Sequence, residues 1–555
     1  MRLADSAGEQ TFHSSGWEMC KNENDEAQAR LSSGGRRVSG ARNVERWGTF
    51  EVVLDGPSEA SATAWSRRRN PFTDVKVSAR FSRATKTVEV PGFYDGNGVY
   101  RVRFMPEETG AWSWESRSNR PELRGARGAF TCLRPGVDNH GPVRVARRYH
   151  FSYADGTPFF SLGTTAYAWT YRPEQIRRKT LQSFSRYGFN KIRMLVFPKH
   201  YGDGKNVDIS YDPPFFPYEG SPGVWDRTRF VPAYFRNFED RVGDLRGRGI
   251  EADVILFHFY DFGKWGLDEG TRRVDDLRYV QYITARLSAY RNVWWSLANE
   301  YDLIDSRHSH GGLAFSPDRK DWDAIGRYLA AHDPYGHLRS VHQWPFGLLF
   351  PNRPWLTHVS YQNTGTYSLL MDLKREYGKP VINDEYQYEG NIPMDWGNCS
   401  AEEETIRHWA AVMAGGYATH GEAFNTQANH RDIFWSYGGT LRGGSPPRLL
   451  FMKDLVSSLP FQEMEPDTHR GDGRNLFCLR RGHEAYLYFM TPGWKDHQML
   501  FVGPSEGGAH EYEAVVYDAW ACRKVRSATW KCGLVRPLRL PPFAAIVLKR
   551  RRGLR

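Results

Sequence analysis

The chain has 555 residues, of which 40% are hydrophobic and 14% aromatic, so we expect two or three domains with sizeable cores and no wholesale disorder. Its net charge is +11, but the arginines are scattered and the basic clusters at 67–69 and 549–552 are short. Because no helix-turn-helix or RNA-binding signature is present, this charge indicates a solvated surface or an acidic polysaccharide substrate, and no nucleic-acid partner.

The N-terminal part of the chain changes character near residue 44. Residues 1–43 are polar and lack periodicity, so we expect a disordered lead-in. Residues 44–147 contain short runs that alternate between apolar and polar side chains and are separated by turns such as 94–98. This pattern is typical of a β-sandwich.

From residue 148 to 460, strand-like runs alternate with helical patterns. Strands are expected at 159–166, 191–196, 251–258, 293–298, 337–342, 357–362, 380–383 and 416–424. Helices are expected at 173–187, 233–246, 274–290, 322–331, 368–377, 401–414 and 449–459. The series has the size and order of a (β/α)8 TIM barrel. Residues 461–550 return to a β pattern, so the predicted fold class is α/β, a barrel flanked by an N-terminal and a small C-terminal β-sandwich.

Cysteine spacing and hydropathy give no sign of a metal, a cofactor or a membrane. The six cysteines show no CxxC or zinc spacing, and although Cys522 and Cys532 could pair across a hairpin, free buried thiols are expected. No apolar stretch reaches membrane-spanning length, so no membrane partner is expected. The first residues lack the apolar core of a signal peptide, which predicts a cytoplasmic protein, or a secreted one if the start site is misassigned.

Two of the predicted barrel strands end in carboxylates that packing does not explain. Val293 to Leu297 form a largely apolar run, and Asn299 and Glu300 follow after one further residue. The segment 379–386 repeats the pattern, with acids after a short apolar run. Ligands bind at the carboxyl ends of barrel strands, and two carboxylates there are the equipment for cleaving a glycosidic bond.

These carboxylates can be given roles. Glu300 is expected to be the acid/base, Glu385 the nucleophile, and Asn299 a ligand of a sugar hydroxyl. Carboxyl groups about 5 Å apart would give retention by double displacement, whereas a gap of about 6.5–9.5 Å would give inversion. Asp384, next to Glu385, stays open as an alternative nucleophile.

Asn299-Glu300 after strand four and Glu385 after strand seven resemble the motif of the retaining (β/α)8 glycoside hydrolases of clan A. Arg193, at the end of strand two, matches the buried arginine that this clan keeps near its nucleophile. The resemblance also implies that Tyr361, on strand six, hydrogen-bonds the nucleophile.

A narrower resemblance comes from three short segments. The sequences RMLVFPKH at 193–200, FWSYGG at 434–439 and SPPR at 445–448 are similar to those of apiosidase-like glycoside hydrolases. The order of sandwich, barrel and sandwich is similar too. This family commonly has Asp-Gly-Glu where the present chain has Asn-Asp-Glu at 383–385. The resemblance implies action on the side chains of plant cell-wall glycans.

Further side chains at strand ends are candidate substrate ligands. His200, His258 and His342 end strands two, three and five, and each could bind a sugar, bind a metal or be a satisfied core group. Trp435 is a candidate stacking surface for a sugar ring. Glu422 on strand eight is either a third acid at the barrel mouth or a partner for the arginine on strand two.

The leading prediction is a retaining glycoside hydrolase that acts on a plant or microbial polysaccharide or oligosaccharide. Exo action is expected because the long aromatic loop 200–230 would shorten the cleft. One alternative is a non-catalytic carbohydrate-binding protein on a glycosidase scaffold. Another is a metal-dependent barrel hydrolase, which is disfavoured because residues 164–169 lack the His-x-His that such enzymes carry after strand one.

Overall fold

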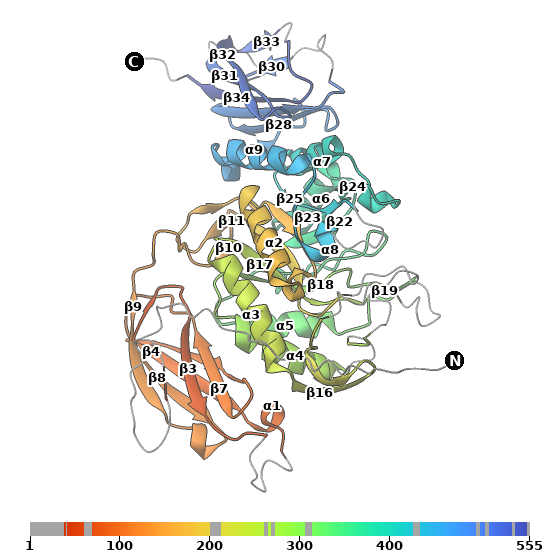
Figure 1. Ribbon diagram of the computed structural model, residues 1–555. Coiled ribbons are helices and arrows are strands. Elements are labelled where there is room, and N and C mark those ends of the chain that lie inside the picture. The colour runs from red at the N-terminus through yellow and green to blue at the C-terminus, as the bar shows by residue number, and fades with distance from the viewer. Residues whose placement is uncertain are drawn as a thin grey trace, which may run out of the picture.

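Three regions follow one another along the chain in the computed structural model (Figure 1). The structure describes residues 38–39, 42–59, 69–199, 213–259, 265–267, 272–305, 313–425, 433–494, 500–504, 510–535 and 539–551. A β-rich N-terminal region lies at one end, an α/β barrel in the middle and a second β region at the other end. Within these described ranges no helix combines the length and apolar character needed to cross a bilayer.

Eight parallel strands form the central sheet, which confirms the predicted (β/α)8 architecture. In spatial order they are β21 (Arg339–Ser340), β18 (Val293–Ala298), β17 (Glu251–Phe257), β14 (Lys191–Leu195), β13 (Gly163–Thr165), β25 (Tyr417–His420), β23 (Val381–Glu385) and β22 (Val359–Gln362). The two end strands meet where the amide of Thr357 donates to the carbonyl of Arg339 over 2.9 Å. The sheet is therefore nearly closed, with its strand ends gathered at one mouth.

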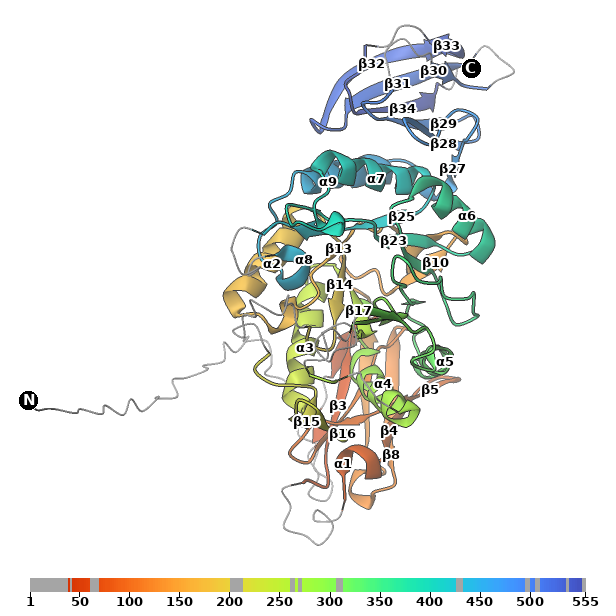
Figure 2. The ribbon, with the colours of Figure 1, turned by 90° about the vertical axis from the view of Figure 1, so that its right-hand side faces the viewer.

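Helices alternate with these strands and cover the outside of the barrel (Figures 1 and 2). They are α2 (Glu174–Arg186), α3 (Pro232–Arg246), α4 (Arg273–Leu287), α5 (Trp322–His332), α6 (Tyr367–Tyr377), α7 (Ala401–Met413) and α9 (Ser445–Ser457). Between β21 and β22 the chain is described throughout residues 341–358, and it forms a loop without a helix.

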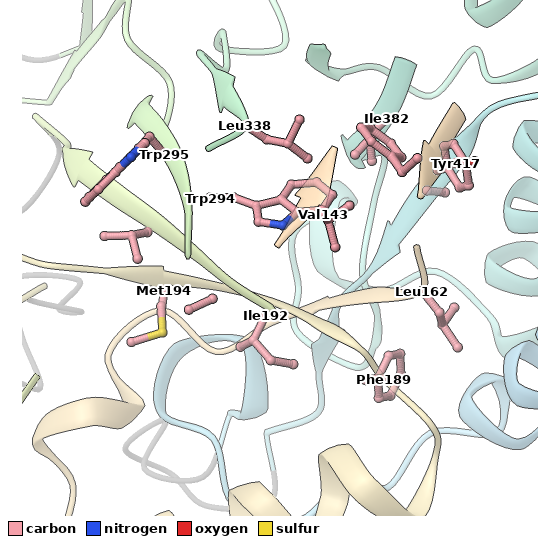
Figure 3. Close-up of a cluster of buried hydrophobic side chains, with 14 of the residues drawn as sticks. Val143, Leu162, Phe189, Ile192, Met194, Trp294, Trp295, Leu338, Ile382 and Tyr417 are labelled. Atoms are coloured by element: carbon pink, nitrogen blue, oxygen red, sulfur yellow. The ribbon is translucent and has the colours of Figure 1, made fainter. Parts of the chain in front are cut away.

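The barrel strands are buried on both faces, as Trp294 and Trp295 of β18 show (Figure 3). Trp295 faces a helix and donates through Nε1 to Asp333 Oδ2 at 2.9 Å. Trp294 faces inward, donates to Glu251 Oε2 at 2.9 Å and packs against Phe151. Neighbouring residues of one strand thus serve opposite layers of the core.

A small antiparallel sheet lies against the inner ring of the barrel. It consists of β10 (Val143–Ala146), β11 (His150–Tyr153) and β12 (Pro158–Phe159). Phe151 packs on Trp294 and Tyr417 from this sheet. The predicted strand 159–166 was therefore too long: Phe159 belongs to β12, and the first barrel strand begins only at Gly163.

The N-terminal region contains two facing antiparallel-rich sheets, as expected for a sandwich. One has the order β1 (Val38–Ser39), β3 (Phe50–Asp55), β7 (Val99–Phe104) and β6 (Phe93–Tyr94). The other has the order β2 (Asn43–Glu45), β9 (Arg127–Leu133), β8 (Gly110–Ser118), β4 (Val77–Arg83) and β5 (Lys86–Pro91). Residues 1–37 of the predicted lead-in lie outside the described residues. Residues 38–39 and 43 belong to strands β1 and β2 and not to a disordered segment.

The C-terminal region lies over α7 and α9 (Figure 2). Its main sheet has the order β27 (Glu465–Pro466), β28 (Leu476–Arg481), β29 (Ala485–Met490), β34 (Ala544–Arg550), β31 (Glu511–Asp518) and β32 (Arg523–Lys531). A second sheet pairs β30 (Leu500–Val502) with β33 (Gly533–Val535). The stacked rings of Trp409 and Phe489, 4.5 Å apart, join this region to α7. Cys522 and Cys532 are free thiols.

Candidate active site

Glu300 stands in the turn that follows β18 and has a left-handed backbone, with φ of +48°. Such a conformation is uncommon for a residue with a side chain and persists only where the surroundings hold it. Two hydrogen bonds to His342 do so: the Glu300 amide donates to Nδ1 at 3.4 Å, and the Tyr301 amide donates to the His342 carbonyl at 2.9 Å. These contacts fix the turn that carries Glu300 at the carboxyl end of β18.

The Glu300 carboxyl is half-buried, and burial raises its pKa to about 7. Lys199 and Arg193 act in the opposite direction, because a nearby cation favours the charged form, and Asp302 adds to the rise. A hydrogen bond with the Gln362 side chain also lowers the pKa. The group therefore carries a proton for much of the time at neutral pH, as a general acid must.

Glu385 is the last residue of β23 and is only 7% exposed. Arg193 of β14 donates from Nη1 to its Oε1 at 3.1 Å, and the Tyr167 hydroxyl donates to the same oxygen. The other nitrogen of the guanidinium, Nη2, donates to Asn299 Oδ1 at 2.5 Å. One buried arginine thus ties the ends of strands four and seven together across the barrel mouth.

Two opposing effects act on the Glu385 carboxyl. Burial raises its pKa to about 8, and a hydrogen bond with Tyr388 lowers it. The Arg193 contact and the Tyr167 hydroxyl also stabilise a carboxylate more than a neutral acid. The Arg193 guanidinium is itself fully buried, so solvent screens its charge little and it favours the carboxylate form of Glu385.

Asp384, the neighbouring acid, has quite different surroundings. Its Oδ1 accepts from Lys191 Nζ at 2.8 Å and from Thr419 Oγ1 at 2.6 Å, and its Oδ2 accepts from Ser360 Oγ at 2.6 Å. Burial alone would raise the pKa of Asp384, but Lys191 and Arg193 hold it below its usual range. These partners come from β14, β22 and β25, so the side chain joins strands inside the barrel.

Aromatic rings form a wall beside Glu385. Trp435 is half-buried and lies 5.8 Å from Tyr388 in a stacked arrangement, and it meets Tyr167 and Trp396 edge to face at 6.0 and 5.3 Å. Trp396 is 40% exposed. Such amphipathic rings next to a carboxylate suit the face of a sugar, as the sequence suggested for Trp435.

Three of the four remaining predicted ligands are buried in the structure, and the fourth lies outside the described residues. His342 is fully buried behind Glu300, and burial together with Arg193 lowers the pKa of its imidazole well below the usual value, so the ring is neutral. His258 is buried and contacts the Pro198 carbonyl through Nε2 at 3.2 Å. Tyr361 is fully buried opposite Asn383. His200 lies outside the described residues.

Tyr167, which the sequence pattern did not single out, contacts Glu385. The structure brings the Tyr167 hydroxyl, from the end of β13, to the position on the carboxylate that the resemblance suggested for Tyr361. A tyrosine two residues beyond a barrel strand is the signal that could have found it.

Glu422, expected as a third acid at the mouth or a partner of the arginine on strand two, lies just beyond β25 and is bound by backbone amides. Its two oxygens accept from the amides of Arg442 and Gly443, each at 2.7 Å. The nearby carboxylate of Glu389 accepts from the amides of Gly444 and Ser445. The two acids thus bind the backbone amides of residues 442–445 and stabilise the start of α9. In the described part of the chain, His, Cys, Asp and Glu side chains form no group of three or more suited to a metal ion.

Comparison with known proteins places this site in context. A family model described as the apiosidase-like catalytic domain matches residues 146–435, and a model of a domain of unknown function, DUF5060, matches residues 43–119. A solved protein from Bacteroides vulgatus ATCC 8482 that is classed among the glycoside hydrolases is 34% identical, with a TM-score of 0.79, and the match covers 92% of this chain and 100% of that one.

More distant structures share the fold alone. A glycoside hydrolase family 5 protein from Bacteroides vulgatus ATCC 8482 is 16% identical, with a TM-score of 0.53, over 74% of this chain and 94% of that one. No curated protein matches the chain.

Proposed function

Since the chain belongs to the apiosidase-like family of glycoside hydrolases, we propose that it cleaves its glycosidic bond with retention, using Glu385 as the nucleophile and Glu300 as the acid/base. The observation that carries this proposal is the guanidinium of Arg193, which contacts Glu385 and Asn299 at once. It joins the end of strand four, where Glu300 follows Asn299, to the end of strand seven, which carries Glu385, and this supports a pair of carboxyl groups that act at one mouth.

Each residue then has a definite task. The Glu385 carboxylate attacks the anomeric carbon while Glu300 gives its proton to the leaving oxygen, and a covalent glycosyl-enzyme forms. Glu300, now ionised, takes a proton from water, and the resulting hydroxide attacks the anomeric carbon and releases Glu385. Asn299, held by Arg193, is placed to bind the neighbouring sugar hydroxyl.

The surroundings of Asp384 favour Glu385 over it as the nucleophile. Both Asp384 oxygens already accept hydrogen bonds from Lys191, Ser360 and Thr419 inside the barrel. A carboxylate so occupied would have to break several buried contacts before it could attack a sugar. Glu385 instead stands next to the aromatic wall.

For the substrate we propose a plant or microbial polysaccharide or oligosaccharide, which the enzyme cleaves from one end of the glycan. The family to which the chain belongs supports this class. A panel of nitrophenyl glycosides that includes furanosides would identify the sugar.

Two substitutions test the mechanism. Glu385→Gln is expected to abolish turnover, because the amide cannot attack. Glu300→Gln is expected to slow hydrolysis of unactivated glycosides about 10²- to 10⁴-fold, with azide restoring turnover of an activated substrate. Proton NMR of the first product should show the configuration of the substrate. Inversion of configuration, or full activity in either variant, would refute the proposal.

A further inference from the structure

The loop between β21 and β22 exposes large apolar side chains at the barrel mouth. Phe346 is 82% exposed and Leu348 is 61% exposed. The ring of Trp344 is half-buried and meets that of Phe346 edge to face at 5.1 Å. Exposed apolar groups gathered beside an active site mark a binding surface more often than chance.

This loop is rigidly built onto the turn that carries Glu300. Asp302, which is fully buried, accepts from the Trp344 amide at 2.7 Å through Oδ1 and from the Leu348 amide at 2.9 Å through Oδ2. The Tyr301 hydroxyl donates to the Leu348 carbonyl at 2.9 Å. A β-carbon at Gly347 would lie 1.8 Å from Asp302 Oδ2, so only glycine allows the loop to close around this carboxylate.

The loop also begins at the partners of Glu300. His342 accepts the Glu300 amide hydrogen bond, and Gln343 donates from Nε2 to the Gln362 carbonyl at 3.2 Å. The Gln362 side chain in turn bonds the Glu300 carboxyl. Trp344 is the next residue, so the exposed rings continue directly from the surroundings of the proton donor.

We propose that Trp344 and Phe346 form a stacking surface for the sugar on the leaving-group side of the scissile bond. The acid protonates the leaving oxygen, so a surface continuous with Glu300 faces the leaving group, whereas the Trp435 wall stands beside Glu385. The substrate class is then a glycan whose leaving group is itself a sugar. This inference rests on the proposed function, because it takes Glu300 as the acid.

The test compares two substrates with one glycone, chosen by the nitrophenyl glycoside panel: a disaccharide and a glycosyl fluoride. Fluoride offers no ring to stack. Phe346→Ala is expected to raise KM for the disaccharide about five- to tenfold and to change KM for the fluoride less than about twofold. Since Phe346 is exposed, the variant should fold normally.

Trp396→Ala is the matched control, because Trp396 is an exposed ring on the Glu385 side. This variant should raise KM for the disaccharide and for the glycosyl fluoride by a similar factor. Equal effects of Phe346→Ala on the two substrates, or no effect on either, would overturn the stacking surface while leaving the hydrolase intact. A change only in sedimentation would show that the surface joins copies of the chain and would likewise overturn it. No hydrolysis of any panel member would instead contradict the proposed function.

Discussion

Two adjacent acids of β23, Asp384 and Glu385, contact different buried cations. Lys191 reaches both Asp384 and Asp253, whereas Arg193 reaches Glu385. Asp384→Asn would leave Lys191 in contact with Asp253 but would remove part of the compensation for a buried charge, which costs up to about 3–5 kcal/mol. The variant is therefore expected to lower the free energy of unfolding by up to that amount, as measured by chemical denaturation.

Glu385→Gln is the matched control for that experiment. This variant also removes a carboxylate from a buried cation, Arg193, so it should lose some stability too, but it should abolish turnover in protein that is still folded. If Asp384→Asn stayed fully stable and lost all turnover, and Glu385→Gln stayed active, the two roles would have to be exchanged.

The protonation of Glu300 predicts how activity depends on pH. Burial raises its pKa to about 7, and the group must be protonated to give its proton to the leaving oxygen. The value of kcat/KM for an unactivated glycoside should therefore fall as the pH rises above about 7. The measurement is a pH profile under conditions where the protein remains folded.

The pH profile of Glu300→Gln with a dinitrophenyl glycoside distinguishes the loss of the Glu300 proton from the titration of other groups. That leaving group needs no proton, and glutamine does not titrate, so the alkaline decline should disappear. An unchanged decline would assign it to another group.

At the scale of a strand, β17 begins with a buried acid that the chemistry does not use. Burial raises the pKa of Glu251 to about 8, while the Trp294 indole donates to it at 2.9 Å. A carboxyl whose folded pKa is raised contributes stability below its unfolded pKa, and this is lost as the pH rises to the folded value. The window here runs from about 4.5 to about 8.

Glu251→Gln should remove this pH dependence, because glutamine stays neutral and its oxygen still accepts from Trp294. At pH 9 the variant is expected to be more stable than the wild type by roughly 2–4 kcal/mol. At pH 4 the two should agree. Denaturation curves at both pH values measure the difference, and equal stability at pH 9 would rule out the buried ionisation.

The boundaries of most barrel elements were predictable, since they depend on local periodicity. The strand predicted at 293–298 and the helix predicted at 322–331 are confirmed to within one residue. The first strand was misjudged because Phe159 and Gly163 belong to one apolar run that two different sheets share. No local pattern marks the point where the chain passes from one sheet to the other.

At the scale of the molecule, buried charges join the N-terminal sandwich to the barrel. Glu239 of α3 pairs with Arg103 of β7 at 2.9 Å and with Arg286 of α4, which also pairs with Asp95 at 2.8 Å. Burial alone would raise the pKa of Glu239, but the two guanidiniums more than offset this and lower it. The sandwich therefore docks on the barrel through buried ion pairs in which each charge compensates the other.

Glu239→Gln should cost about 3–5 kcal/mol of unfolding free energy, because two buried guanidiniums lose a shared partner. We expect the sandwich and the barrel to separate earlier in denaturation, seen as protease cleavage near residues 134–142. Glu403→Gln, which affects an exposed pair with Arg407, is the control and should change stability by less than about 1 kcal/mol. Equal effects of the two substitutions would contradict a docking role.

The placement of Glu300 and Glu385 at the ends of barrel strands was readable from the sequence, since an apolar run followed by an acid is a local signal. The sequence also indicated Arg193 and the class of reaction. The contact between Tyr167 and Glu385, 218 positions apart in the chain, and the burial of Asp384 inside the barrel became visible only in the folded structure. The reason is physical: these contacts depend on the register of β13, β14 and β23, and the hydrophobic pattern of a single strand holds no information about its neighbours.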